Sequence, residues 1–368
     1  MIALNNAQIE LVINARHTLH MLAEPSEKEA KTKEFVLRFI ETYTDLQLYD
    51  MGKWCYAVHA EKNATKTIVI RADMDAVAFE NGQCYHACGH DGHTAALLGV
   101  ALLLNGNCVG NNIVLLFQHA EETGRGAAEC VELFNRIWVD EVIGCHNIPG
   151  YPVGKVLLRD DTMACASCGA AIGLNGTPAH AAYPENGKNP AYALAQLVNG
   201  LQGIVLDVTN KYSCMALATI VGLECGGEFF GVAASMGKLC VTLRAETDTA
   251  LNCLINNIEN SVAEAARKNG LDYCIEYRDT FPATLNNKHC TQKLRNVCIN
   301  NSIPYSYLDE PFRWSEDFGH YTKYKDCVMF GIGSGISTPP LHTSGYEYPD
   351  ELIAYTVPVF MSYIMQSS

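Results

Sequence analysis

KTIVIRA, residues 66–72, is a short, β-branched and almost wholly apolar run of the kind that forms a buried strand. A Gly/His-rich stretch follows it, and the apolar residues 94–104 then have the composition of a buried helix. NIVLLFQ, residues 112–118, repeats the strand pattern, and residues 126–136 and 141–145 (EVIGC) are predicted to form a helix and a third strand. Strands that alternate with helices in this way predict an α/β domain.

The hydrophobic pattern changes on either side of this region. Residues 6–45 carry apolar positions at helical spacing. From about residue 165 the predicted elements follow the order β-α-β-β-α-β, which is typical of a separate α+β domain. The α/β pattern returns near the end with a strand and a helix over residues 349–364. We therefore expect a two-domain α/β protein, in which a domain made of residues 1–163 and 278–368 carries an insertion, residues 164–277.

Length and composition set the class of protein. The chain has 368 residues, of which 48% are hydrophobic and 18% charged, enough for two globular cores. A formal charge of −14 argues against a nucleic-acid partner, although it leaves room for a local site that binds an anionic substrate. The start of the chain lacks the features of a signal peptide, and no apolar run approaches a bilayer span. We therefore expect a cytoplasmic protein without a membrane partner, whose sixteen cysteines are reduced thiols.

A cluster of metal-binding residue types lies between the first strand and the helix that follows it. Residues 86–93 read HACGHDGH, with three imidazoles and one thiol in eight positions. Zinc and similar ions prefer these ligands, and the glycines allow the backbone to turn Cys88 and His90 inward. A lone histidine is more often structural, but packing does not explain so dense a cluster.

Further candidate ligands follow other predicted strands. Glu121 and Glu122 come directly after NIVLLFQ, and their side chains point in different directions, so that one can bind a metal while the other faces a water molecule. His146 follows the strand EVIG, and His342 lies in the loop after the last strand. Alone, a pair of glutamates is usually a solvated loop and a single histidine is weak evidence. Because loops at strand ends meet at one edge of an α/β sheet, the four segments together predict a metal centre.

Several of these motifs resemble the M20 peptidase family, and in particular its N-acyl-amino-acid, hippurate and indole-acetyl-amino-acid amidohydrolases. The resemblance begins loosely at RHTLHMLAEPSEKEAKT and is more specific at RADMDAV, HACGHDGHTA and FQHAEETGRGA. It continues through GCHNIPGYPVG around His146, GTPAHAAYPENGKNP around His180 and SEDFGHY at residues 315–321. The resemblance implies a zinc-peptidase-like catalytic domain and a ferredoxin-like lid that often also forms a dimer.

The resemblance also assigns roles within a centre of two divalent ions, zinc or manganese, with cobalt as a further option. Glu121 would be the general base for a metal-activated water, and His180 would reach the oxyanion of the tetrahedral intermediate. The five implied metal ligands are Cys88, which would bridge the ions, His90 and His146 on one ion, and Glu122 and His342 on the other.

Two acidic residues are candidates to orient these ligands. Asp73, at the end of the first strand, is expected to hold a ligand histidine, and Asp91 is a weaker candidate for the same role. Relatives also carry an asparagine about a dozen residues before the arginine of the lid's edge strand, but counting back from Arg244 gives Gly231. Because that asparagine helps to hold substrate in the family, its absence puts the substrate class in doubt.

The function expected from these residues is hydrolysis of the amide bond in an N-acyl amino acid or a related small acylated amine, by a homodimer. A dipeptidase or carboxypeptidase would use the same centre, and would need a carboxylate such as Glu224 or Glu228 for the free amino terminus. A non-catalytic metal-binding relative is the third possibility. The presence of Glu121 and of all five implied ligands argues against that reading.

Overall fold

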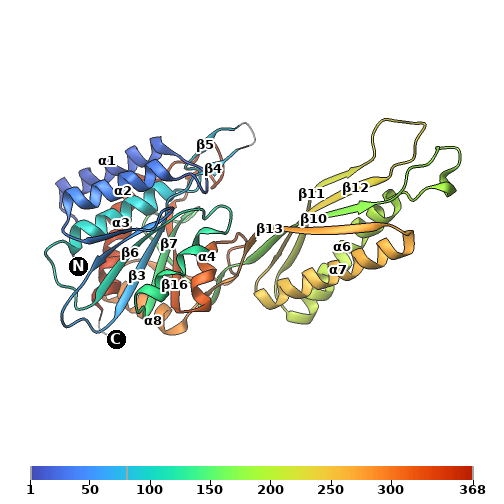
Figure 1. The fold of residues 1–368 in the computed structure, drawn as a ribbon. Helices are drawn as coiled ribbons and strands as arrows, with labels where there is room; N and C mark the ends of the chain where they lie inside the picture. The colour runs from blue at the N-terminus through green and yellow to red at the C-terminus, as the bar shows by residue number, and fades with distance from the viewer. Residues whose placement is uncertain (1, 80–81, 367–368) are drawn as a thin grey trace. The chain divides into compact units, whose positions relative to one another are not determined.

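The computed structural model describes residues 2–79 and 82–366 and divides into two compact units (Figure 1). The first unit comprises Met1–Met163, Thr284–Pro311 and Glu316–Ser368, and the second comprises Ala164–Ala283 and Phe312–Ser315. The chain returns to the first unit at Thr284 and not at residue 278, because the strand β13 (Asp272–Phe281) continues to pair within the second unit as far as Phe281.

The first unit is built on a sheet of eight strands in the order β1-β2-β6-β3-β7-β16-β8-β15. The strands are β1 (Gln47–Asp50), β2 (Cys55–His59), β3 (Thr67–Asp73), β6 (Asn112–Gln118), β7 (Glu141–Pro149), β8 (Val156–Leu158), β15 (Tyr305–Tyr307) and β16 (Asp326–Gly335). The central strands β6, β3, β7 and β16 are parallel, whereas β2 and β8 are antiparallel to their inner neighbours. All seven residues of β3 are buried, as expected for a parallel strand that is covered on both faces.

Helices cover both faces of this sheet. On the face to which Ile68 and Ile70 point lie α1 (Asn6–Leu22), α2 (Ala30–Tyr43), α3 (His90–Leu104), α8 (Lys288–Asn300) and α9 (Ile353–Met365). On the face to which Arg71 points lie α4 (Gly126–Cys130), α5 (Leu133–Arg136) and the 3-10 helix η2 (Asp317–Lys323). The apolar run at residues 94–104 is confirmed as a helix that is buried over its whole length.

Two predicted helical stretches are interrupted in the structure. The pattern over residues 6–45 forms two helices, because the connection between them contains Pro25, which cannot continue a helix. The predicted helix over residues 126–136 is also two short helices. Between them the amides of Glu132, Phe134 and Asn135 bond to carbonyls three residues earlier, so the ladder tightens locally to 3-10 spacing.

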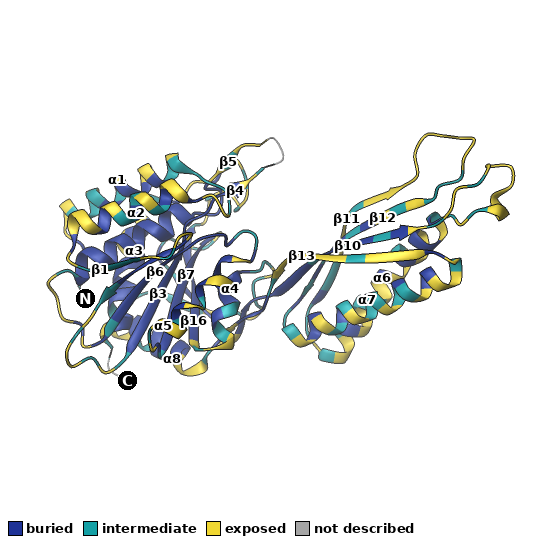
Figure 2. Cartoon of the chain, in the orientation of Figure 1, coloured by how far each residue is buried: buried dark blue, intermediate teal, exposed yellow. Residues whose placement is uncertain are grey.

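The second unit has the predicted β-α-β-β-α-β order. Its elements are β10 (Ala166–Asn175), α6 (Ala191–Tyr212), β11 (Ala216–Cys225), β12 (Met236–Ala245), α7 (Asp248–Asn269) and β13. The four strands are antiparallel in the order β11-β12-β10-β13, which confirms a ferredoxin-like arrangement. α6 and α7 share a core with the sheet, whereas β11 and β13 carry many exposed residues (Figure 2).

One helix of this unit combines the length of a membrane span with an apolar composition. Among the described residues, only α6 is long and apolar enough to cross a bilayer by length and composition. Leu194, Leu197 and Leu201 of this helix are buried in the core of the second unit. Because the core helix of a globular domain passes the same test, α6 is weak evidence for a membrane.

Candidate metal centre and active site

The candidate site lies where the parallel strands of the first unit end. Cys88 and His90 flank Gly89, which begins α3 in a left-handed conformation with φ of 93°. A Cβ atom at Gly89 would come within 2.7 Å of the Asn147 side chain, so this position requires glycine both for its backbone and for its space. The tight turn directs the Cys88 thiol and the His90 ring toward the ends of β6 and β7.

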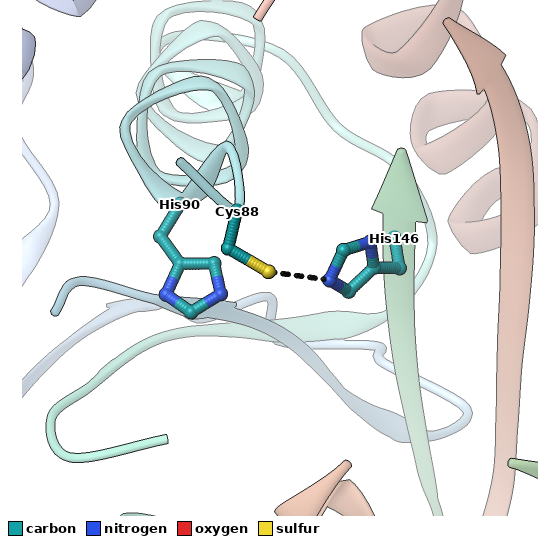
Figure 3. A group of neighbouring side chains, drawn as sticks. All are labelled: Cys88, His90 and His146. Atoms are coloured by element: carbon teal, nitrogen blue, oxygen red, sulfur yellow. Dashed lines mark hydrogen bonds between the residues drawn. The ribbon is translucent and has the colours of Figure 1, made fainter. Parts of the chain in front are cut away.

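Five side chains form two groups of three that share one sulfur atom. Cys88, His90 and His146 form one group, and Cys88, Glu122 and His342 form the other, with the ligand atoms of each group within 4.8 Å of one another. The Cys88 Sγ lies 3.4 Å from the Nε2 of His146 (Figure 3). It also lies 3.4 Å from the Nε2 of His342. The two groups contain the same residues as the two ligand sets that the resemblance implies.

His146 lies differently from its predicted position. It was expected to follow a strand that ends at residue 145, but β7 continues to Pro149 because its pairing with β16 extends to Gly335. The side chain therefore projects from within a strand, which holds it more rigidly than a loop would. Glu121, Glu122 and His342 do lie in loops, after β6 and β16.

The hydrogen bonds around His90 leave one of its nitrogens free for a ligand. Its Nδ1 lies 2.9 Å from the carbonyl oxygen of Asp75 and 3.2 Å from the Asp75 carboxylate, which fixes the proton of the neutral ring on Nδ1. The Nε2 of His90 and the Oε1 of Glu122 are buried, and neither has a hydrogen-bond partner among the described residues. Two buried atoms with unused lone pairs in one site are what a bound cation would satisfy.

The charge balance of the site also favours a cation. Burial raises the pKa of the Cys88 thiol well above its usual range, and burial with the neighbouring Asp75 raises the pKa of Glu122 to about 7. Without a counter-charge these groups would therefore hold protons that metal ligands must lose. Thiolate, imidazole and carboxylate are a donor set that suits zinc, manganese or cobalt. The residues present therefore fit divalent metal ions.

Glu121 lies beside the two groups and is 5% exposed. Its Oε1 accepts a hydrogen bond of 3.3 Å from the backbone amide of Asp317, whereas Oε2 lies 3.9 Å from the Nε2 of His90. Behind it, the buried Arg71 contacts Glu316 and Asp317 at 2.8 Å each. Burial and the charge of Glu316 raise the pKa of Glu121 well above its usual range, so this carboxylate is disposed to take up a proton.

The residue that holds the candidate ligand His90 is Asp75, which the sequence did not single out. The Asp75 side chain contacts the His90 ring and also accepts the backbone amide of Glu122 at 3.0 Å. The predicted residue, Asp73, contacts Arg71 and His93 at 2.7 Å and comes no closer than 3.6 Å to His90. RADMDAV contains both aspartates. Asp73 is the last residue of β3, whereas Asp75 follows the strand and contacts His90 at the beginning of α3.

The weaker candidate, Asp91, contacts a different part of the first unit. Its carboxylate lies 3.2 Å from Arg16 and 2.8 Å from His20, both on α1. These contacts fix α1 against the beginning of α3. Both of these partners lie on α1, so the contacts seen for Asp91 join two helices.

The second unit holds His180 and Gly231 in adjacent backbone segments. His180 is exposed, and its Nδ1 accepts a hydrogen bond of 3.0 Å from the amide of Ala182. The proton of a neutral ring is then on Nε2, which is available as a donor. The carbonyl of Gly231 accepts the amide of Ala181 at 3.0 Å, so the position at which relatives carry an asparagine lies beside His180 in this chain.

Arg244 is not on an edge strand, contrary to expectation. It lies on β12, which pairs with β11 on one side and with β10 on the other. Its Nη1 donates to the carbonyl of Arg313 at 3.1 Å and to the hydroxyl of Ser315 at 2.8 Å. These bonds give Arg244 a structural role within the second unit.

Comparison with known proteins identifies the family. The profile of peptidase family M20/M25/M40 matches residues 69–366, most of the chain. The chain belongs to this family. It is therefore an enzyme, a metal-dependent amidohydrolase.

Relatives that align over most of their length support this assignment. The chain is 27% identical to an N-acetyldiaminopimelate deacetylase of Exiguobacterium sibiricum, over 97% of this chain and 100% of that protein. It is 27% identical to the hippurate hydrolase of Campylobacter jejuni, over 92% of each chain. It is 30% identical to the N-acetyl-L-cysteine deacetylase of Bacillus subtilis, over 85% of this chain and 78% of that protein. The fold is similar to that of the Bacillus subtilis YXEP protein, a dinuclear metal-binding M20 peptidase, with a TM-score of 0.83, 22% identity and 98% of each chain covered.

Proposed function

We propose that this M20 enzyme hydrolyses the amide bond of small N-acyl amino acids, using two divalent metal ions held by Cys88, His90, His146, Glu122 and His342. The observation that carries the proposal is the pair of ligand groups that share Cys88, with the Glu121 carboxylate beside both. When bound, such ions supply Lewis acidity, which lowers the pKa of a water molecule and polarises an amide carbonyl. Zinc, manganese and cobalt all suit this mixed donor set.

Glu121 moves the proton in the proposed reaction. With Oε1 held by the amide of Asp317, Oε2 remains available to take a proton from the attacking water. The oxygen of that water bonds to the carbonyl carbon while the carbonyl π electrons move onto the carbonyl oxygen, which gives a tetrahedral intermediate. When the C=O bond re-forms, the C–N bond breaks, and Glu121 passes the proton to the departing amine nitrogen. The products are a carboxylic acid and an amine.

His180 stabilises the negative oxygen of the tetrahedral intermediate in this proposal. The support is its tautomer, because the bond from the Ala182 amide to Nδ1 leaves Nε2 as the proton donor. A neutral N–H aimed at a developing oxyanion is worth about 2.7–4 kcal/mol in other enzymes.

The proposed substrate class follows from the relatives, which include two kinds of N-acetyl deacetylase and a hippurate hydrolase. Gly231 has no side chain to hold a substrate carboxylate, so we infer that substrate selection differs from that of relatives with an asparagine at this position. A dipeptidase or carboxypeptidase activity is the alternative that the same centre permits.

We further propose that the protein is a cytoplasmic homodimer, with the second unit as its dimerisation domain. β11 is an edge strand with an unpaired side, and its residues Val221 and Leu223 are more than half exposed. Unpaired apolar edges of this kind are suited to pair with a second copy around a two-fold axis. Sedimentation of wild-type protein beside Val221→Lys tests this, with a dimer expected for the former and a monomer for the latter.

The experiment that tests the function is amine release from a panel of N-acyl amino acids and dipeptides by metal-loaded protein, beside Glu121→Gln. We expect N-acyl amino acids to be cleaved, and kcat of the variant to fall about 10²–10⁴-fold with its metal content unchanged. Cleavage of dipeptides alone would favour the peptidase. If nothing is cleaved although two metals are bound, the proposal is wrong and a binding role replaces it.

A further inference from the structure

The loop that carries Glu121 and Glu122 is shaped by its backbone. Ala120 is fully buried and adopts a positive φ of 50°, which is unusual for a residue with a side chain. The amides of Gly124 and Gly126 bond back to the carbonyls of Glu121 and Ala120, which closes the turn. Two amides, those of Ala120 and Glu122, point outward from this turn and bond to side chains from elsewhere.

Glu29 accepts the first of these amides. It lies at the beginning of α2, 91 residues before Ala120, and is 3% exposed. Its Oε1 is 2.7 Å from the amide nitrogen of Ala120. Glu29 occupies the N-cap position of α2 yet makes no side-chain cap bond to that helix.

Another residue performs the capping that Glu29 does not. The Oε2 of Glu24 accepts the amides of Lys31 and Thr32 at 2.9 Å each, and these belong to the first turn of α2. The carboxyl of Glu29 therefore does not cap α2, and its Oε1 accepts the amide of Glu27 at 3.1 Å as well as the amide of Ala120. The same connection between α1 and α2 is also linked to the backbone at Glu122.

The link to Glu122 is indirect and passes through Asp75. The hydroxyl of Ser26 donates to the Oδ2 of Asp75 at 2.6 Å, and the same oxygen accepts the amide of Glu122 at 3.0 Å. The connection between α1 and α2 therefore contacts the backbone on both sides of Glu121. Glu29 bonds to the amide of Ala120, and Ser26 is linked through Asp75 to the amide of Glu122.

We propose that Glu29 is a positioning residue for the Glu121–Glu122 pair, which it holds by accepting the buried amide of Ala120. The proposal rests on the roles given to Glu121 and Glu122 above. A buried amide that loses its acceptor is costly, so the loop would shift to reach another partner or water. A shift of about 1 Å in a catalytic group can lower a rate about 100-fold.

The contact that Glu29 makes with the loop is an acceptor oxygen on a backbone amide. Burial and the neighbouring Asp75 raise its pKa to about 7, so near neutral pH a large share of the molecules carry a protonated Glu29. The charged and polar groups that face it are Asp75, the amides of Ala120 and Glu27, and its own amide. A glutamine at this position has an oxygen at the same reach, whereas an aspartate keeps the charge but is one methylene shorter.

The test compares Glu29→Gln, Glu29→Asp and Glu29→Met in the full chain, with Glu24→Met as the matched control at the same helix terminus. For each variant we would measure kcat, KM and metal content, together with amide hydrogen exchange in peptides that cover residues 117–126. We expect Glu29→Gln to match the wild type. Glu29→Asp and Glu29→Met should lose about 10- to 100-fold in kcat with KM little changed, and should exchange faster in the 117–126 peptides. Glu24→Met should change neither kcat nor the exchange rate in the 117–126 peptides.

Three results would overturn the proposal. Glu29→Met could behave as Glu24→Met does, Glu29→Gln could lose as much activity as Glu29→Met, or Glu29→Asp could retain full activity while Glu29→Gln does not. If Glu29→Met does not fold, the glutamine and aspartate variants decide alone. If the wild type cleaves no substrate, the proposed function fails, and the exchange data still show whether Glu29 holds the loop.

Discussion

The candidate metal centre in the first unit and the segment 224–238 in the second unit differ in how their side chains are held. In the centre, Cys88 and His90 are at most 5% exposed, and Asp75 fixes His90 through two contacts. In the segment, Phe230 is 93% exposed, and a cavity of about 640 Å³ is lined largely by small or apolar residues such as Val232 and Met236. Buried, hydrogen-bonded side chains are held in one geometry, whereas exposed and loosely packed side chains can be substituted with little effect on the rest of the fold.

The largest expected effect comes from the atom that the two ligand groups share. Cys88→Ala removes a ligand from both groups, so we expect kcat to fall about 10³-fold or more, which corresponds to several kcal/mol of transition-state stabilisation. Mass spectrometry of the metals should find fewer than two ions per chain. Cys145→Ala, at another buried cysteine, should keep both ions. A Cys88→Ala protein that retains two ions and its activity would show that the buried centre does not depend on the shared sulfur. The comparison between the two regions would then be wrong.

The next effect tests whether the second unit takes part in the chemistry. His180→Ala should lower kcat about 10²–10³-fold, because the oxyanion loses a donor, while the metal content stays at the wild-type value. Steady-state kinetics with one N-acyl amino acid are sufficient. If kcat stays within about threefold of the wild type, the catalytic groups are confined to the first unit, and the contrast with the second becomes sharper.

A smaller effect tests the rigidity of the centre. Asp75→Asn weakens the charged partner of His90 and should lower metal affinity about 10- to 100-fold, measured by competition with a chelator. Asp91→Asn is the control, because Asp91 contacts Arg16 and His20 and should leave metal affinity unchanged. Equal losses in both variants would show that the aspartates near α3 act through overall charge.

The smallest effect concerns the exposed segment. Phe230→Ala should change the free energy of unfolding by less than about 0.5 kcal/mol, because the ring is almost wholly in solvent. Phe318→Ala, the same change in the core of the first unit, should cost about 3–5 kcal/mol. Denaturant unfolding measures both. A large loss for Phe230→Ala would mean that the segment is packed in solution, contrary to the comparison.

The sequence predicted the two-unit architecture well, because buried strands and amphipathic helices have distinct periodicities. The structure brings candidate ligands from four segments near strand ends together, since parallel strands deliver their following loops to one edge. The strand predicted to end at residue 145 continues to Pro149, because the extension of β7 depends on its pairing with the distant strand β16. The helical spacing of apolar residues does not reveal the break after α1, where the connection contains Pro25. Nor does it reveal the split at residues 131–132, which is a local shift in hydrogen bonding.

The supporting residues of the site were harder to predict than the ligand types. Asp75 and Glu29 act through backbone amides or a single imidazole nitrogen, and no composition rule marks a carboxylate that accepts an amide 47 or 91 residues away. Asp317 lay within a motif that the sequence did single out, SEDFGHY, but its contact with Glu121 is made by its backbone. Such contacts are set by tertiary structure and are almost independent of local pattern.

Arg71 is the shared counter-ion of three buried carboxylates, Asp73 beside it and Glu316 and Asp317 far along the chain. A substitution at any one of these positions alters the electrostatic environment of the other two, so their effects on stability should not add. We therefore expect a change at one of the four positions to be tolerated best together with a compensating change at another. Directed evolution of this enzyme would accordingly gain little by randomising them one at a time.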